Sequence, residues 1–291
     1  MKRIFLLLFT LMVTLFAFTA CGEQSLPQTG EGDAIGDTLR IGMSCDNPPF
    51  SWIQDTEAED DSTLPLSNGD GYVGGYDVQV AKEIADQLGV NLEIVQYDRG
   101  DLIGAVEDGD IDLMIAGVNP LATRADRIDF TDSYYDNDYV VIVLKDGRYA
   151  DVTKISGFAG ARITAQTDSY IYTDLLPQMD DIKIMPGMTF HRDMRVALSN
   201  DIIDGYVTTR PEGMEATRLH PEYAMVTLGE DGGFETDSEY SSVAIGLAKG
   251  RDVLLAAVNG VLHKISDDQR SLWMERAVYA VPENYDDTTT E

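Results

Sequence analysis

The sequence predicts an α/β protein of two lobes, each organised around a mostly parallel sheet. Apolar strand-like runs alternate with helical patterns from Leu39 to Val118, and the alternation restarts after a solid apolar run at Tyr139–Leu144. This order is typical of parallel strands joined by right-handed helical crossovers. A length of 291 residues suits one large domain or two of modest size, and 44% hydrophobic residues supply a core.

The first lobe is expected to hold three strands and two helices before residue 118. Asp77 is expected to cap a helix that stops at Gly89, since glycine readily adopts the left-handed conformation at a helix end. The acidic segment Gln54–Gly71 is expected to be a surface loop. The predicted strands are Leu39–Met43, Val90–Ile94 and Ile111–Val118, and the second predicted helix contains Leu102, Ile103 and Val106.

The second half of the chain repeats the alternation. Apolar residues from Leu254 to Ile265 follow helical spacing over three turns and predict a long helix. Tyr139–Leu144 and Val243–Leu247 are expected to be strands that cross between the lobes. Because ligands of open α/β sheets bind at the carboxyl ends of strands, we expect a site in the cleft between the lobes. The other predicted elements are strands at Arg162–Ala165, Ile182–Ile184 and Gly205–Thr208, and helices at Ser169–Leu176 and Met194–Leu198.

The first 21 residues have the pattern of an export signal. A basic start is followed by a mostly apolar stretch of 17 residues, shorter than the roughly 20 that a membrane-spanning helix needs. The ending Phe18-Thr19-Ala20-Cys21-Gly22 resembles a bacterial lipoprotein signal, which implies that Cys21 becomes a lipid-bearing N-terminus; an ordinary secretory peptide is the alternative. Residues 22–37 are predicted to be a flexible tether, and with Cys21 lipidated, Cys45 has no intramolecular disulfide partner.

The charge of the chain excludes whole classes of partner. There are 51 Asp and Glu against 21 Lys and Arg, and removal of a signal peptide containing Lys2 and Arg3 changes the formal net charge from −30 to −32. Nucleic-acid binding requires clustered basic side chains that face phosphates, so we expect no nucleic-acid partner. Docking onto anionic lipid by charge is equally disfavoured.

Five motifs occur in an order that resembles one known family. They are Leu39-Arg40-Ile41-Gly42, Gly75-Tyr76-Asp77-Val78, Gly109-Asp110-Ile111-Asp112-Leu113, Asp129-Phe130-Thr131-Asp132-Ser133-Tyr134-Tyr135 and Gly246-Leu247-Ala248-Lys249-Gly250. Together they resemble the family 3 extracellular solute-binding proteins, the polar amino-acid receptors of ABC importers. The resemblance implies a periplasmic-binding-protein-like (type II) fold with two hinge crossovers. Lobe 1 would then comprise 38–135 and 243–282, lobe 2 would comprise 136–242, and 283–291 would be an acidic tail.

The resemblance also implies a ligand site. Arg124 matches the arginine that holds the α-carboxylate of the ligand in a bidentate fork, a geometry that lysine cannot reproduce. The alternative for Arg124 is a surface arginine that pairs with Asp126 or Asp129. The other matching positions are Gly117 and Asn119 at a strand end and Ser169 and Tyr170 at a helix N-terminus, and Phe50 and Trp52 are aromatic candidates for the cleft wall.

Three positions depart from the family pattern. Thr209 stands where an acidic residue normally meets the ligand ammonium, while Arg99 and Asn47 stand where aromatic residues normally line the pocket. These departures favour an anionic ligand, such as one with two acidic groups. Glu212 or Asp46 could restore the ammonium site, which leaves a simple amino acid as the alternative.

No motif points to a metal, a cofactor or catalysis. The sequence contains no G-x-S-x-G, phosphate-loop or H-E-x-x-H pattern, and His191, His220 and His263 lack metal-ligand spacing. We therefore predict a lipid-anchored, extracytoplasmic receptor that hands a small carboxylated solute to an ABC permease. The alternatives are a cleft enzyme resembling cyclohexadienyl or arogenate dehydratase, and a sensor that presents its closed form to a membrane partner.

Overall fold

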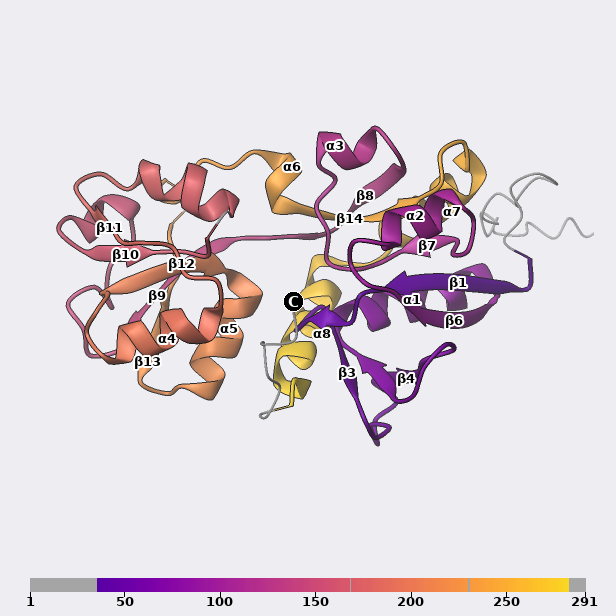
Figure 1. Cartoon of the computed structure of the whole chain (residues 1–291), viewed down its shortest axis with the longest axis horizontal. Coiled ribbons are helices and arrows are strands. Elements are labelled where there is room, and N and C mark those ends of the chain that lie inside the picture. Colours follow the sequence, from indigo (N-terminus) through magenta and orange to yellow (C-terminus); the bar gives the residue numbers. More distant parts are fainter. Residues whose placement is uncertain (1–35, 168, 230, 283–291) are drawn as a thin grey trace, which may run out of the picture.

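The computed structural model describes residues 36–167, 169–229 and 231–282. The predictions for the signal peptide, Cys21, nearly all of the tether and the acidic tail fall outside these ranges. Two five-stranded sheets form two separate lobes, and a small four-stranded sheet is attached to the first lobe (Figure 1). None of the described helices is both long and apolar enough to cross a membrane.

The first sheet has the order β6-β1-β7-β14-β8. Strand β1 pairs in parallel with β6 and β7, while β14 runs antiparallel between β7 and β8. Its strands are β1 (Thr38–Met43), β6 (Asn91–Gln96), β7 (Leu113–Met114), β8 (Asp129–Asp136) and β14 (Ser242–Leu247). Leu113 and Met114 pack into different apolar clusters because successive side chains of a strand point to opposite faces, so both faces of this sheet are buried.

Helices cover both faces of the first sheet. Its helices are α1 (Tyr76–Leu88), α2 (Leu102–Glu107), α3 (Ala122–Ala125), α7 (Asp252–Leu262) and α8 (Asp267–Ala280). Apolar residues of α1, α7 and α8 join one core cluster, and those of α2 join the cluster on the other face. The predicted stop of α1 is confirmed, because Gly89 adopts a left-handed conformation with φ 69°.

The second sheet has the order β11-β10-β12-β9-β13. Val141 and Val143 of β9 pack into one cluster while Val140 and Ile142 pack into another, which explains why this strand is apolar throughout. Its strands are β9 (Tyr139–Leu144), β10 (Arg162–Thr164), β11 (Lys183–Ile184), β12 (Gly205–Thr209) and β13 (Tyr223–Val226). Its helices are η1 (Ile155–Phe158), η2 (Ile171–Leu175), η3 (Leu176–Gln178), α4 (His191–Ser199) and α5 (Arg210–Leu219).

The prediction that Tyr139–Leu144 and Val243–Leu247 cross between the lobes is wrong. All six residues of β9 pair with β12 or β13 in the second sheet, and β14 pairs with β7 and β8 in the first. The chain crosses instead at Asn137–Asp138 and again just before β14, where α6 (Ser238–Ser241) lies. Figure 1 shows these two connections running between the lobes.

The segment predicted to be a surface loop contributes to a third sheet. Strands β2 (Asp46–Asn47), β3 (Ser51–Gln54), β5 (Tyr72–Gly74) and β4 (Thr63–Pro65) pair in that order. Thr63 and Leu66 are buried, and Leu66 joins the apolar cluster that also contains residues of β1 and α1, so part of the segment packs on lobe 1. The sequence pattern missed this strand because few of its residues are apolar.

Two further differences concern helices. Asp77 does not cap α1, because the helix begins at Tyr76 with Gly75 as its N-cap, and the buried Asp77 carboxylate accepts a hydrogen bond from Tyr134 Oη at 2.7 Å. Helix α8 was not predicted, and of its residues Met274, Ala277 and Val278 are buried. Such a narrow apolar stripe gives a weak periodic signal.

Gly75 permits a close approach on which the start of α1 depends. Its φ of 130° is a conformation that favours glycine, and an added Cβ would lie 2.1 Å from the Phe50 carbonyl oxygen. We predict that Gly75→Ala destabilises the protein by about 2 kcal/mol or more in chemical denaturation. The matched control is Gly104→Ala in α2, where an added Cβ meets nothing within 4 Å, and which we expect to be neutral or stabilising by up to about 1 kcal/mol. Equal stability of both variants would contradict this account.

Candidate functional site

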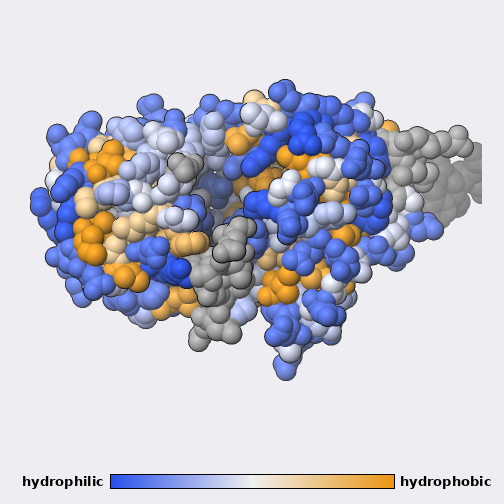
Figure 2. Space-filling view, in the orientation of Figure 1, coloured by the Kyte–Doolittle hydropathy of each residue, from blue (hydrophilic) through white to orange (hydrophobic). Residues whose placement is uncertain are grey.

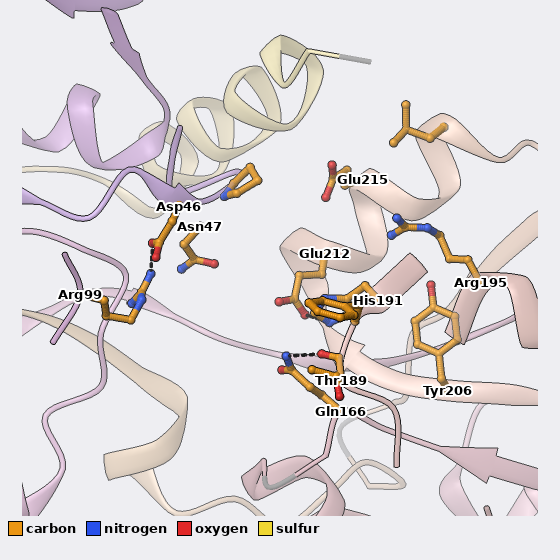
Figure 3. Close-up of a pocket in the computed structure, with 13 residues that line it drawn as sticks. Asp46, Asn47, Arg99, Gln166, Thr189, His191, Arg195, Tyr206, Glu212 and Glu215 are labelled. Carbon is orange, nitrogen blue, oxygen red and sulfur yellow. Dashed lines mark hydrogen bonds and ion pairs between the residues drawn. The ribbon is translucent and has the colours of Figure 1, made fainter. Parts of the chain in front are cut away.

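A cavity of about 330 Å³ lies between the two lobes. Figure 2 shows the surface hollowed between the lobes, and Figure 3 shows lobe 1 side chains facing lobe 2 side chains across the gap. Lobe 1 contributes the β2 segment and Arg99, whereas lobe 2 contributes α4, α5, Tyr206 of β12 and the segments around Gln166 and Thr189. The lining residues are Asp46, Asn47, Pro48, Arg99, Gln166, Thr189, Phe190, His191, Arg195, Tyr206, Glu212, Glu215 and Leu219.

Arg99 faces the cavity but its charge is compensated. Its Nη2 donates to Asp46 Oδ1 at 2.6 Å and to Ser44 Oγ at 3.0 Å, and its Nη1 donates to the Ala116 carbonyl oxygen at 3.3 Å. Burial opposes ionisation of Asp46, but the hydrogen bond and charge of Arg99 keep the pKa of that carboxyl below its usual value. Because Asp46 already occupies this guanidinium, Arg99 does not offer the second anion site that the sequence suggested.

Glu212 places a carboxylate on the lobe 2 wall. It stands at the third position of α5, where its side chain and that of the N-cap residue Thr209 form a reciprocal capping box. Glu212 Oε2 accepts from Thr208 Oγ1 and from the Thr209 backbone N–H, and lies 3.3 Å from His191 Nε2. Although burial raises the pKa of Glu212, His191 and these donors outweigh burial and lower it to about 2, so the carboxylate is ionised.

Arg124 lies in the short helix α3, beside the lobe 1 wall. Its Nη1 donates to the Asn119 carbonyl oxygen at 2.8 Å, and within the described ranges no carboxylate lies within ion-pair distance. Burial, and then the positive charge of Arg99, lower the pKa of the guanidinium. Neither alternative partner, Asp126 or Asp129, forms an ion pair with Arg124 in the described ranges, and Asp129 instead accepts from Lys249 Nζ at 3.3 Å.

The donors expected at Gly117 and Asn119 are engaged within the protein. The Gly117 N–H donates to Tyr134 Oη at 3.1 Å, and Asn119 Nδ2 donates to the carbonyl oxygens of Tyr240 at 2.9 Å and Ser242 at 2.7 Å. Gly117 has a φ of 59°, and a Cβ there would lie 2.7 Å from Asn47 Nδ2. Gly117 thus shapes the strand end, and Asn119 ties the second interlobe connection to lobe 1 through Tyr240.

Ser169 and Tyr170 lie at the start of η2, on the lobe 2 side of the same connection. Ser169 Oγ donates to the Gln166 carbonyl oxygen at 2.6 Å and accepts from the Tyr172 N–H at 3.2 Å. The Tyr170 ring stacks on Tyr240 with centroids 4.2 Å apart, and its hydroxyl accepts from the Asp237 N–H. In this conformation their polar atoms are engaged with protein.

The two aromatic candidates lie in the core of lobe 1. Phe50 is buried edge-on against Tyr135, with ring centroids 5.6 Å apart, and is not part of the cavity wall. Trp52 is 1% exposed, and its Nε1 donates to Gln54 Oε1 at 3.1 Å. The cleft prediction for Trp52 is therefore corrected, since its strand β3 belongs to the small sheet and its ring lines a separate pocket with Trp273.

Of the ten predicted ligand-binding residues, Asn47 and Arg99 line the described cavity. Sequence reasoning named Glu212 and Asp46 as alternatives and interpreted His191 as structural or surface, but it missed Tyr206 and Glu215. The available signal for Glu215 was its spacing of three residues from Glu212 in the helix that follows β12.

In the part of the chain that the structure describes, no group of three or more His, Cys, Asp or Glu is placed to hold a metal ion.

Comparison with known proteins identifies the family. The pattern of the bacterial extracellular solute-binding proteins, family 3, matches residues 39–272. The chain belongs to this family. The arginine-binding extracellular protein ArtP of Bacillus subtilis is 30% identical over 158 residues, which are 54% of each chain, and the ABC transporter arginine-binding protein 1 of Escherichia coli is 23% identical over 81% of this chain and 88% of its own.

Solved structures confirm the predicted two-lobed type II binding-protein fold. An ancestral cationic amino acid solute-binding protein superposes with a TM-score of 0.64 at 21% identity, over 83% of this chain and 96% of its own. A second structure of that ancestor, described as a precursor of cyclohexadienyl dehydratase, has a TM-score of 0.55 at 20% identity, over the same shares of the two chains. At these identities the likeness establishes the fold alone.

Proposed function

We propose that this protein is the substrate-binding lipoprotein of an ABC importer and that it captures a small carboxylated solute, an α-amino acid or a close relative, between its lobes. Family membership supports the class of protein, and the named relatives of Bacillus and Escherichia bind arginine. A membrane permease is the partner to which such a receptor delivers its solute.

The observation that carries the proposal is the state of Arg124. Its guanidinium is partly buried, with a lowered pKa and without a carboxylate at ion-pair distance in the described ranges. A desolvated arginine is stabilised by a charge-assisted, bidentate pair with a carboxylate. The α-carboxylate of a ligand supplies that partner.

A zwitterionic ligand also needs an acceptor for its ammonium. Thr209 serves as the helix cap, so it does not act as that acceptor here, and Asp46 is held by Arg99. Glu212 is ionised and faces the cavity from lobe 2, opposite the lobe 1 wall (Figure 3). Contacts to Arg124 on one lobe and to Glu212 on the other would favour the closed state, because both are satisfied together only when the lobes approach.

A cleft enzyme is the second candidate, because one feature favours it. Burial raises the pKa of Glu215 while that of Glu212 is lowered, and two carboxyls with divergent pKa values in one cavity suit acid–base chemistry. Incubation with arogenate, followed by chromatography of the products, separates the two candidates. A receptor returns the compound unchanged, whereas a dehydratase converts it.

Arg124→Ala should abolish high-affinity binding while the fold persists. Loss of one partner from a buried charged pair costs on the order of 2–5 kcal/mol in binding free energy. The measurement is calorimetry with the L-amino acid that most raises the melting temperature of the wild-type protein in a screen of the common amino acids. Arg127→Ala is the matched control, since Arg127 is an exposed arginine paired with Glu107, and it should bind normally. Wild-type affinity in Arg124→Ala would remove Arg124 from the site.

The lipid anchor is the second part of the proposal. Cys21 follows an apolar export signal and precedes a polar segment suited to tethering a receptor to the membrane surface. Cys21→Ser should therefore move the protein from the membrane pellet to the soluble extracytoplasmic fraction of a producing cell, as followed by immunoblotting. Cys45→Ser is the control, because Cys45 is buried in lobe 1 and should not alter the distribution. Retention of the Cys21 variant in the pellet would refute the anchor.

A further inference from the structure

Helix α5 turns two carboxylates toward the same cavity. Glu212 lies in its first turn and Glu215 three residues later, and Figure 3 shows both on the side that faces lobe 1. Residues at this spacing are neighbours on one helix face, about 5–6 Å apart at Cβ. Glu212 has a role in the proposed receptor function, whereas Glu215 has none there.

The contacts of Glu212 leave one edge of its carboxylate toward the ligand space. The Thr208 hydroxyl, the Thr209 N–H and the His191 ring all approach the same oxygen, Oε2. Oε1 is outside this set of contacts. The protein thus fixes the Glu212 carboxylate through Oε2, and Oε1 remains for a cationic group of the ligand.

Tyr206 adds an unsatisfied polar atom to the same wall. It lines the cavity from β12, is 1% exposed, and its buried hydroxyl has no hydrogen-bond partner within the described residues. In Figure 3 this hydroxyl points toward the side where Arg195 and Glu215 lie. A buried hydroxyl without a partner is destabilising, so a ligand atom that bonds to it is favoured there.

The side chains that line the cavity include one more carboxylate than guanidinium. The cavity wall carries three carboxylates, two guanidiniums and one imidazole. The ion pair between Asp46 and Arg99 compensates one charge of each sign. On lobe 2, burial raises the pKa of Glu215, Arg195 opposes this effect, and the nearby Glu212 reinforces it. On balance the pKa of Glu215 is raised, so its ionised form is disfavoured. A further positive charge beside Glu215 would stabilise that ionised form.

We propose that Glu215 and Tyr206 form a distal subsite for the cationic end group of a basic α-amino acid. This rests on the proposed function, with the α-carboxylate on Arg124 and the α-ammonium on Glu212. The two glutamates, one helical turn apart, then match the two positive groups of the ligand. The aliphatic part of the ligand lies between them, and Tyr206 accepts an N–H of the end group.

The test compares L-arginine with L-citrulline, which has nearly the same length and shape but a neutral end group. Calorimetry should show arginine bound at least about tenfold more tightly by the wild-type protein. Glu215→Gln should remove about tenfold or more of the arginine affinity and change citrulline affinity by less than about threefold. Tyr206→Phe should weaken arginine binding by roughly three- to tenfold, as expected for one lost hydrogen bond. Glu222→Gln is the control, because it removes an exposed lobe 2 carboxylate that does not line the cavity.

Several results would overturn the distal subsite. They are an equal loss of both ligands in Glu215→Gln, unchanged arginine affinity in that variant, and a wild-type preference for citrulline or for a dicarboxylic amino acid. Failure of the wild-type protein to bind arginine would overturn it as well. The proposed function fails separately, when no amino acid binds or when Arg124→Ala retains the affinity of the wild-type protein.

Discussion

An ionised side chain withdrawn from water is stable only beside an opposite charge or several hydrogen-bond partners, and this constraint organises the cleft. Arg99 satisfies it with Asp46, and Glu212 satisfies it with the donors at the start of α5 and with His191. Arg124 has a carbonyl partner and no ion pair in the described ranges. The cleft therefore supplies partners for Arg99 and Glu212 and leaves the Arg124 guanidinium for a ligand carboxylate.

The hinge links this electrostatic arrangement to movement of the lobes. Tyr240, on the second connection, accepts through its carbonyl oxygen from Asn119 of lobe 1 and from the Tyr139 hydroxyl of lobe 2, while its ring stacks on Tyr170. Asn119, Tyr139 and Tyr170 thus anchor the chain around Tyr240 to both lobes. A ligand held by Arg124 and Glu212 would act across that hinge, and closure is favoured by contacts that exist only when both lobes are engaged.

The sequence was most informative where burial creates a strong pattern. The apolar run Tyr139–Leu144 was predicted as a strand because both of its faces are buried, although its place in the second sheet could not be read from one strand alone. Helix α8 and strand β4 were missed because few of their residues are buried. Local apolar patterns specify elements, whereas their partners depend on the assembled core.

The site was predictable only in part for the same reason. Arg124 and Arg99 follow from motif positions, but the pairing of Arg99 with Asp46 joins residues 53 positions apart. Tyr206 looks like a core residue of an apolar strand, and its role at the cavity depends on a hydroxyl left without a partner. Such features arise from packing between distant elements, which spacing along the chain does not encode.

The position of a bound α-carboxylate tests the central claim most directly. The experiment is a crystal structure of the protein with the amino acid that most raises its melting temperature. The account predicts closed lobes, with the ligand carboxylate within hydrogen-bond distance of the Arg124 guanidinium and its ammonium beside Glu212. A ligand bound outside the interlobe cavity, or one whose carboxylate contacts other groups while Arg124 remains without an anion, would contradict the account.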